Sequence, residues 1–216
     1  RVLGKTEDAT KYAALFDSIK KAFAAAYVGA DGLIRGDTQT AYALALRFGL
    51  LPEATRALAG KRLADDVAKR GVLTTGFIGV AHLLPALTLA GRTDLAYALL
   101  QNDKYPSWLY SIKKGATTIW ERWDGIRENG DFQTPSMNSF NHYSFGSVGE
   151  WMYAVIAGIE LDEQAPGYER VRLAPRPGGT LTSASATLET IHGAVGSAWT
   201  LAGKAFSLKV TIPPNV

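Results

Sequence analysis

A mainly helical segment followed by a smaller antiparallel β segment is the fold class that this sequence predicts. Two patterns and their order predict it. From Tyr12 to about Ile159, apolar residues recur every three or four positions, which is the spacing of amphipathic helices. After Pro166, short alternating runs are separated by Gly- and Pro-rich turns, as in antiparallel strands. Because helices and strands do not alternate along the chain, a parallel α/β fold is disfavoured.

The helical part divides into about seven segments bounded by Gly, Pro or capping residues. The expected helices span residues 11–27, 38–48, 53–69, 77–89, 94–100 and 143–159, with a short turn near Trp108. Asp37 and Thr93 are expected to cap helix N-termini, while Gly49 and Gly71 suit left-handed helix ends. Helix pairs joined by short loops are typical of an α/α toroid.

The β part begins after a polar link at residues 161–167, which contains a Pro-Gly turn. Its expected strands span residues 168–174, 181–190, 194–201 and 206–212. The sequence therefore divides into a helical segment, 1–161, and a β segment, 162–216.

Composition excludes several classes of function. The 23 Lys and Arg against 20 Asp and Glu are scattered, whereas nucleic-acid binders concentrate basic residues on one face. No apolar run reaches the roughly 18 residues of a membrane-spanning helix. The sequence has no Cys, and its three His are widely separated without metal-ligand spacing. We therefore expect no nucleic acid, membrane, metal or cofactor partner, and the compartment stays open.

The densest cluster of chemically useful residues spans 107–151. It holds four of the five Trp, together with His142 and the carboxylates Glu121, Asp124, Glu128 and Asp131. Aromatic rings stack on the apolar face of a sugar, and a pair of carboxylates is what glycoside hydrolysis uses. Buried Trp and solvated carboxylates would produce the same pattern, so both interpretations remain at this point.

The order of motifs in this cluster resembles one family. Gly-Ala-Thr-Thr-Ile-Trp-Glu-Arg-Trp-Asp at 115–124, Met-Asn-Ser-Phe-Asn-His-Tyr at 137–143 and Gly-Ser-Val-Gly-Glu-Trp at 146–151 resemble the bacterial α-L-rhamnosidases of glycoside hydrolase family 78. The resemblance extends to residues 37–40, 73–77 and 105–110. It implies a partial (α/α)6 toroid of helical hairpins, the C-terminal half of a catalytic domain, in 1–161. It implies part of an antiparallel β-sandwich in 162–216.

The resemblance also implies roles for individual residues. Glu121 corresponds to the general base of an inverting enzyme, which deprotonates the water that attacks the anomeric carbon. His142 corresponds to a residue that contacts the rhamnose of a terminal α-L-rhamnoside.

Three neighbours of Glu121 are weaker candidates for substrate binding. Trp120 and Trp123 flank the base and are expected to shape the pocket. Asp124 is expected to orient a substrate hydroxyl, although an ordinary ion pair with Arg122 or Arg127 explains it equally well.

One expected motif is missing. The family's general acid lies in an Arg-Asp-Glu motif, whereas the nearest string here, 34–37, reads Ile-Arg-Gly-Asp. Inversion needs two carboxyl groups roughly 6.5–9.5 Å apart. We therefore expect the chain, which starts at Arg1, to be a fragment with little activity alone. Exposed apolar faces of an incomplete toroid would favour a homodimer.

Two other functions stay open from sequence. The first is a carbohydrate-binding or interaction module that keeps the pocket without hydrolysing substrate. The second is a serine hydrolase or esterase, because Ser-x-x-Lys occurs at Ser18–Lys21 and at Ser111–Lys114 and places a nucleophile one helical turn from a base.

Overall fold

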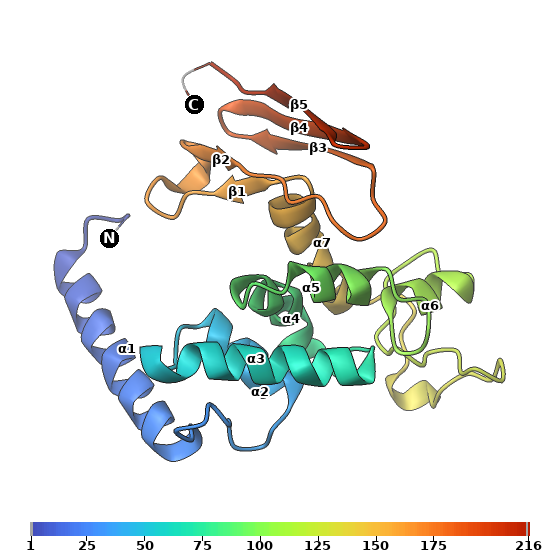
Figure 1. Cartoon of the computed structure of the whole chain (residues 1–216), viewed down its shortest axis with the longest axis horizontal. Coiled ribbons are helices and arrows are strands. Elements are labelled where there is room, and N and C mark those ends of the chain that lie inside the picture. Colours follow the sequence, from blue (N-terminus) through green and yellow to red (C-terminus); the bar gives the residue numbers. More distant parts are fainter. Residues whose placement is uncertain (1, 215) are drawn as a thin grey trace. The chain divides into compact units, whose positions relative to one another are not determined.

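The computed structural model describes residues 2–214 and 216. It contains two compact units, Arg1–Ser147 and Val148–Val216, and each is considered by itself. The first unit is helical and the second is mainly antiparallel β, so the predicted fold class is confirmed (Figure 1). Among the described residues, no helix is both long and apolar enough to cross a membrane.

The helices of the first unit are those expected, with shifted ends. They are α1 (Thr6–Tyr27), α2 (Gln39–Arg47), α3 (Glu53–Arg70), α4 (Phe77–Leu89), α5 (Thr93–Leu100) and α6 (Trp108–Lys113). Gly71 closes α3 with φ of 67°, and Gly49 follows α2 with φ of 63°. Both left-handed ends are confirmed, because only Gly adopts this conformation without a Cβ clash.

The two expected N-caps are wrong. Thr38, not Asp37, caps α2, and its hydroxyl accepts a hydrogen bond from the N–H of Ala41 at 3.2 Å. Asp37 instead has a positive φ of 43°, and its carboxylate accepts the Tyr42 hydroxyl at 2.5 Å. Thr93 is the first residue of α5 rather than its cap. Local residue type identified the helix ends but not which of two neighbouring polar groups reaches the backbone.

The core of the first unit forms where α2 packs on α3 and α4, and α4 packs on α5. Gly79 permits the closest approach: a Cβ there would lie 2.5 Å from Oγ1 of Thr40 on α2. Apolar side chains meet at these contacts and are removed from water, which stabilises the unit. The large buried side chains include Tyr42, Leu51, Leu63, Leu73, Leu83, Leu84, Leu87, Tyr97 and Leu99.

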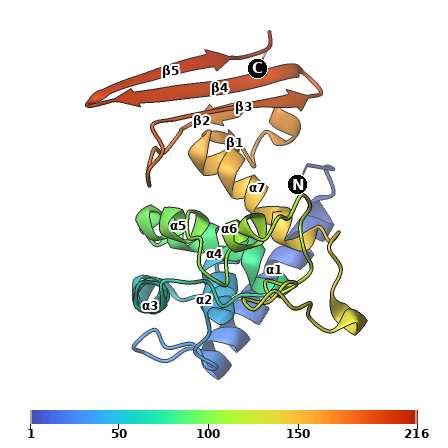
Figure 2. The same ribbon diagram turned by 90° about the vertical axis from the view of Figure 1, so that its right-hand side faces the viewer.

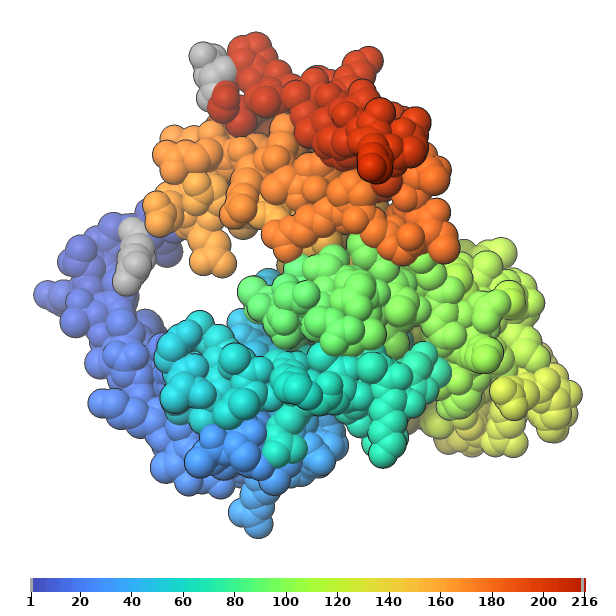
Figure 3. Space-filling view, viewed as in Figure 1, coloured from blue at the N-terminus to red at the C-terminus, as the bar shows by residue number. Residues whose placement is uncertain are grey.

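Helix α1 contrasts with this core because none of its residues is buried. Its apolar side chains Tyr12, Leu15, Phe16 and Ile19 are at least 42% exposed, and their spacing places them on one face. Figure 3 shows α1 in dark blue at the surface. An amphipathic helix therefore presents an apolar face without a covering partner in the described part of the chain.

A buried side chain joins α2 to the end of α3 and the loop that follows it. Gln39 is 2% exposed. Its amide nitrogen donates to Asp66 Oδ2 at 3.0 Å and to the carbonyl of Val72 at 3.2 Å, and its oxygen accepts from the N–H of Thr74 at 2.7 Å. The side-chain amide of Gln39 thus holds the loop before α4, and both its nitrogen and its oxygen are hydrogen-bonded, as a buried polar group requires.

The second unit begins with a short, irregular helix. Residues 148–151 are α-helical (α7) and residues 152–156 form a π turn, so the single helix expected over 143–159 is wrong. Gly158 then reverses the chain with φ of 77°, where a Cβ would lie 2.0 Å from the nitrogen of Pro175. Strand β1 (Ile159–Leu161) follows. The apolar residues between 152 and 161 suit both a helix and a strand, and the pairing of β1 with its neighbouring strand selects the strand at the end of this run.

The strands form two antiparallel sheets (Figure 2). β1 pairs with β2 (Val171–Leu173), and β3 (Ser183–Thr190), β4 (Gly193–Ala202) and β5 (Ala205–Thr211) form a sheet in the order β3-β4-β5. The four expected strands are present with changed ends: β2 and β3 are shorter than expected, β4 is one residue longer at each end, and β5 is shifted by one residue. The expected division after residue 161 would separate β1 from its partner β2.

Two buried side chains of β4 hold the end of the short helix. Trp199 Nε1 donates to the carbonyl of Ile156 at 2.7 Å, and the hydroxyl of Ser197 donates to that of Ala157 at 2.6 Å. The last carbonyls of a helix lack partners within the helix. Within the second unit, strand β4 therefore supplies the hydrogen-bond donors for these carbonyls.

We expect Gln39→Ala to destabilise the first unit by about 1–3 kcal/mol, because the Thr74 N–H and the Val72 carbonyl would lose a buried partner. Urea unfolding followed by tryptophan fluorescence measures the change. Gln164→Ala, at an exposed side chain, is the control. Equal midpoints for the two variants would contradict the role given to Gln39.

Candidate active site

Two segments of the motif cluster lie side by side in the first unit. The N–H of His142 donates to the carbonyl of Ile119, and the N–H of Glu121 donates to that of Ser139, each at 2.8 Å. The Thr118 hydroxyl also donates to the carbonyl of Phe140. This pairing brings Glu121 and His142, which are distant in sequence, onto adjacent segments.

The carboxylate of Glu121 is held at one oxygen. Its Oε2 accepts the N–H of Ser139 at 2.7 Å, while Oε1 has no hydrogen-bond partner within residues 2–214. The side chain is half-buried. One oxygen thus fixes the orientation of the group and the other can accept a proton, which is the arrangement that a general base requires.

His142 is oriented through one ring nitrogen. Its Nδ1 accepts the N–H of Ser144 at 3.3 Å, so the neutral ring carries its proton on Nε2. The ring stacks on Phe77, the first residue of α4, with centroids 4.7 Å apart and planes 8° apart. Nε2 is therefore a hydrogen-bond donor on a ring whose tilt is fixed.

An aromatic stack continues from Phe77 into the unit. Phe77 contacts Phe145 at 5.3 Å, and Phe145 stacks on Trp123 at 3.7 Å with planes 5° apart. Trp123 Nε1 donates to the carbonyl of Thr75 at 2.9 Å, which ties the stack to the residues before α4. Sequence reasoning assigned no role to Phe77 or Phe145, although Phe77 closes the 73–77 motif.

Trp120 lies in different surroundings from Trp123. It is 5% exposed and meets Phe140 edge-to-face at 5.1 Å. A Cβ on Gly125 would lie 3.0 Å from the Trp120 ring, so the chain passes close to it. These contacts support the segment that carries Glu121, and a substrate contact by Trp120 stays a prediction.

Asp124 forms an ion pair with Arg122. The sequence left this pair open as the alternative to a contact between Asp124 and the substrate. Its Oδ1 accepts Nε of Arg122 at 3.0 Å, and its Oδ2 accepts the amide of Gln133. Gln133 also accepts a hydrogen bond from Arg127. Burial by itself would raise the pKa of Asp124, but these hydrogen bonds outweigh it and the pKa is lowered. Asp124 is therefore ionised at neutral pH and is a poor proton donor.

The Ser-x-x-Lys pairs are not arranged as nucleophile and base. The hydroxyl of Ser18 donates to the carbonyl of Ala14 at 2.9 Å. Lys114 Nζ, from the second pair, lies 3.0 Å from the carbonyl oxygen of Glu128 and over the ring of Tyr110. Within the described residues, no group of three or more His, Cys, Asp or Glu could hold a metal ion.

Comparison with known families matches both parts of the chain. Residues 1–156 match the family described as bacterial alpha-L-rhamnosidase 6 hairpin glycosidase domain. Residues 158–216 match the bacterial alpha-L-rhamnosidase C-terminal domain.

Individual relatives agree with the family match. An alpha-L-rhamnosidase of Streptomyces avermitilis is 53% identical over 99% of this chain, and one of Formosa agariphila is 45% identical over 99%. The crystal structure of a Streptomyces avermitilis alpha-L-rhamnosidase complexed with L-rhamnose has a TM-score of 0.92 and 52% identity, covering 96% of this chain and 20% of its own.

A native alpha-L-rhamnosidase from Aspergillus terreus has a TM-score of 0.94 at 37% identity, covering 99% of this chain and 25% of its own. The chain spans 20% and 23% of the lengths of the two curated relatives above.

We expect Asp124→Asn to lower the free energy of unfolding at neutral pH and to do so progressively less in acid. A carboxylate with a lowered folded pKa stabilises the fold above its unfolded pKa of about 3.9, and this contribution disappears as pH falls through the folded pKa. Denaturant unfolding between about pH 6 and about pH 2 measures the difference. Asp17→Asn, on exposed α1, is the control. A pH-independent difference for Asp124→Asn would contradict this account.

Proposed function

Because the chain belongs to the bacterial α-L-rhamnosidase family, we propose that the protein of which it is part hydrolyses terminal α-L-rhamnosides with inversion, with Glu121 as general base. The observation that carries the proposal is the carboxylate of Glu121. One of its oxygens accepts the N–H of Ser139, and it lies on the segment paired with that of His142.

In the proposed reaction, the free oxygen of Glu121 takes a proton from water. The water oxygen bonds to the anomeric carbon, and the bond from that carbon to the leaving oxygen breaks on the opposite face. A carboxylic acid gives its proton to the leaving oxygen. The products are rhamnose of inverted configuration and the free alcohol.

We assign the general acid to a part of the whole protein outside these 216 residues. Two carboxylates of this chain could be considered as the general acid, but both already form other contacts. Asp37 accepts the hydroxyl of Tyr42, and Asp124 is ionised through Arg122 and Gln133. A proton donor needs a raised pKa and free access to the leaving oxygen. The pKa of Asp124 is lowered instead, and the carboxylate of Asp37 is occupied by the hydroxyl of Tyr42.

The sugar is proposed to lie against Phe77 and His142. The Nε2–H of His142 is available to a hydroxyl of the sugar, and the edge of Phe77 offers apolar contact. Trp123 holds Phe77 in place through Phe145. Trp120 supports the backbone of Glu121, and Asp124 orders Arg122 beside it.

We expect Glu121→Gln to lower kcat of the whole protein about 10²- to 10⁴-fold, because an amide cannot accept the proton of water. Release of nitrophenol from nitrophenyl α-L-rhamnoside measures turnover, and NMR of the first-formed rhamnose identifies inversion. The isosteric control is Glu163→Gln, at an exposed carboxylate. Unchanged turnover in Glu121→Gln would refute the assignment.

The same assay separates hydrolysis from binding alone. If the whole protein binds methyl α-L-rhamnoside but releases no nitrophenol, the carbohydrate-binding alternative replaces the enzyme. If Glu121→Gln abolishes turnover and keeps binding, the base assignment is supported.

We also propose that the 216-residue chain forms a homodimer through α1. The face formed by Tyr12, Leu15, Phe16 and Ile19 is exposed. Contiguous apolar surface of this kind favours association, because pairing removes it from water.

We expect Ile19→Lys to shift the chain from dimer to monomer in sedimentation velocity at micromolar concentration, because a charge would enter the apolar contact. Ala14→Lys is the matched control, since 100° per residue places Ala14 on the opposite face of α1. A wild-type chain that sediments as a monomer at every concentration would contradict the dimer.

A further inference from the structure

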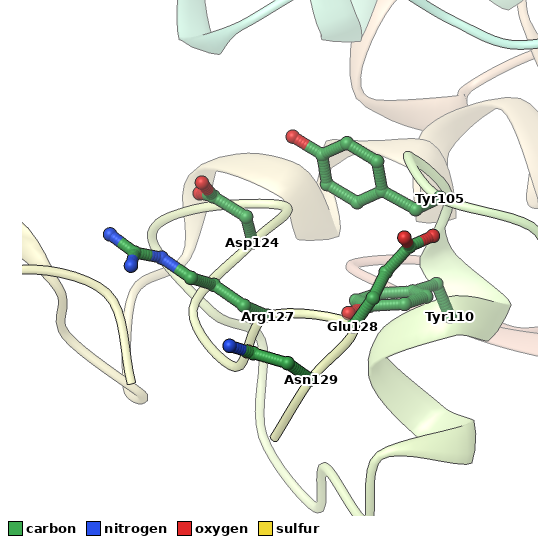
Figure 4. Close-up of a pocket in the computed structure, with 6 residues that line it drawn as sticks. All are labelled: Tyr105, Tyr110, Asp124, Arg127, Glu128 and Asn129. Atoms are coloured by element: carbon green, nitrogen blue, oxygen red, sulfur yellow. The ribbon is translucent and has the colours of Figure 1, made fainter. Parts of the chain in front are cut away.

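A cavity of the first unit has neither Glu121 nor His142 in its lining. Its volume is about 370 Å³, and it is lined by Tyr105, Tyr110, Asp124, Arg127, Glu128 and Asn129 (Figure 4). Pockets for small ligands measure roughly 300–1,000 Å³. None of its lining residues belongs to the group of Glu121, His142 and Phe77.

Part of the lining is fixed by hydrogen bonds. The hydroxyl of Tyr110 donates to the carbonyl of Ile126 at 2.8 Å. Asn129 uses its amide nitrogen on the carboxylate of Asp131 and its oxygen on the N–H of Asp131. These bonds hold the ring of Tyr110 and the turn that carries Glu128, so the cavity has a preformed wall.

Two polar groups of the lining have no hydrogen-bond partner among the described residues. They are the carboxylate of Glu128 and the hydroxyl of Tyr105. Tyr105 is 41% exposed, and its ring meets Tyr110 edge-to-face at 5.4 Å. In Figure 4 the Tyr105 hydroxyl points to the side of the cavity where Asp124 lies. The lining thus contains an oriented aromatic ring and two groups with unused hydrogen-bonding capacity.

Charge favours a neutral ligand with hydroxyl groups. Asp124 is already neutralised by Arg122, and the guanidinium of Arg127 donates to the side chain of Gln133. Burial, and then the negative charge of Asp124, raise the pKa of Tyr105, so its hydroxyl remains a donor at neutral pH. An anion would meet two carboxylates, and the carboxylates number fewer than a metal site needs.

We propose that this cavity binds the ring of a neutral sugar, as a second carbohydrate site separate from the Glu121 site. The exposed ring of Tyr105 packs on the apolar face of the pyranose. The Glu128 carboxylate accepts sugar hydroxyls, and hydrogen bonds to charged groups are the stronger class. Tyr105 and Glu128, which contact the sugar in this proposal, have no part in the proposed hydrolysis. Asp124, which also lines the cavity, is the one residue shared with the surroundings of Glu121, through Arg122.

NMR of the chain with ¹³C-labelled tyrosine rings tests the proposal. Methyl α-L-rhamnoside and methyl β-D-glucoside are titrated in turn, and saturable shifts of the Tyr105 and Tyr110 rings are expected with at least one of them. Glu128→Gln should weaken this binding roughly tenfold, since it replaces a hydrogen bond to a charged acceptor by a neutral one. Tyr105→Phe, which keeps the ring, should weaken it less.

The controls distinguish this site from the proposed active site. Glu163→Gln makes the same chemical change at an exposed position and should leave the titration unchanged. Glu121→Gln should also leave it unchanged while turnover of the whole protein falls. Three results would overturn the proposal: no tyrosine shift with either sugar, equal affinity in Glu128→Gln, or shifts produced by N-acetyl-arginine amide and not by sugar.

Discussion

The hydrogen bonds that pair residues 118–121 with residues 139–142 are the constraint on which the candidate site depends. They place the backbone of Glu121 against Ser139 and that of His142 against Ile119. Ser139 contacts Glu121 twice, because its carbonyl accepts the Glu121 N–H and its own N–H donates to the Glu121 carboxylate. Neither segment is a regular strand or helix, so no repeating ladder maintains their register. The few hydrogen bonds between the two segments, and the aromatic packing around them, therefore maintain their alignment.

That aromatic packing connects the site to the helical core. The stack from His142 through Phe77 and Phe145 reaches Trp123, which is bonded to the carbonyl of Thr75 just before α4. The loop at residues 72–74 is in turn held by buried Gln39 on α2. The site therefore rests on helices that pack closely at Gly79. Rigid helices position a reactive group more accurately than loops alone.

Three carboxylates close together in the sequence have three different environments. Glu121 has one oxygen bound to a backbone N–H. Asp124 has both oxygens bonded to side chains. Glu128 has no side-chain partner in the described part of the chain and lines a separate cavity. Because surroundings determine whether a carboxylate accepts a proton, orders a neighbour or binds a ligand, these residues divide into a proposed base, an ion-pair partner and a proposed sugar contact.

Helix and strand positions were determined by the sequence itself, because apolar periodicity and Gly or Pro breaks act locally. The six helices of the first unit and the strands β2 to β5 follow from this, and the ordered motifs at 115–124 and 137–143 predicted the family. The two helix N-caps, the strand β1 and the irregular helix before it were missed, since competing local conformations there differ little in energy and tertiary contacts select one. The different hydrogen-bond partners of Glu121, Asp124 and Glu128, and the stacking of Phe77 on His142, were decided only by the tertiary structure. Which side chains share a cavity depends on hydrogen bonds and packing between distant segments, and these leave no local period in the sequence.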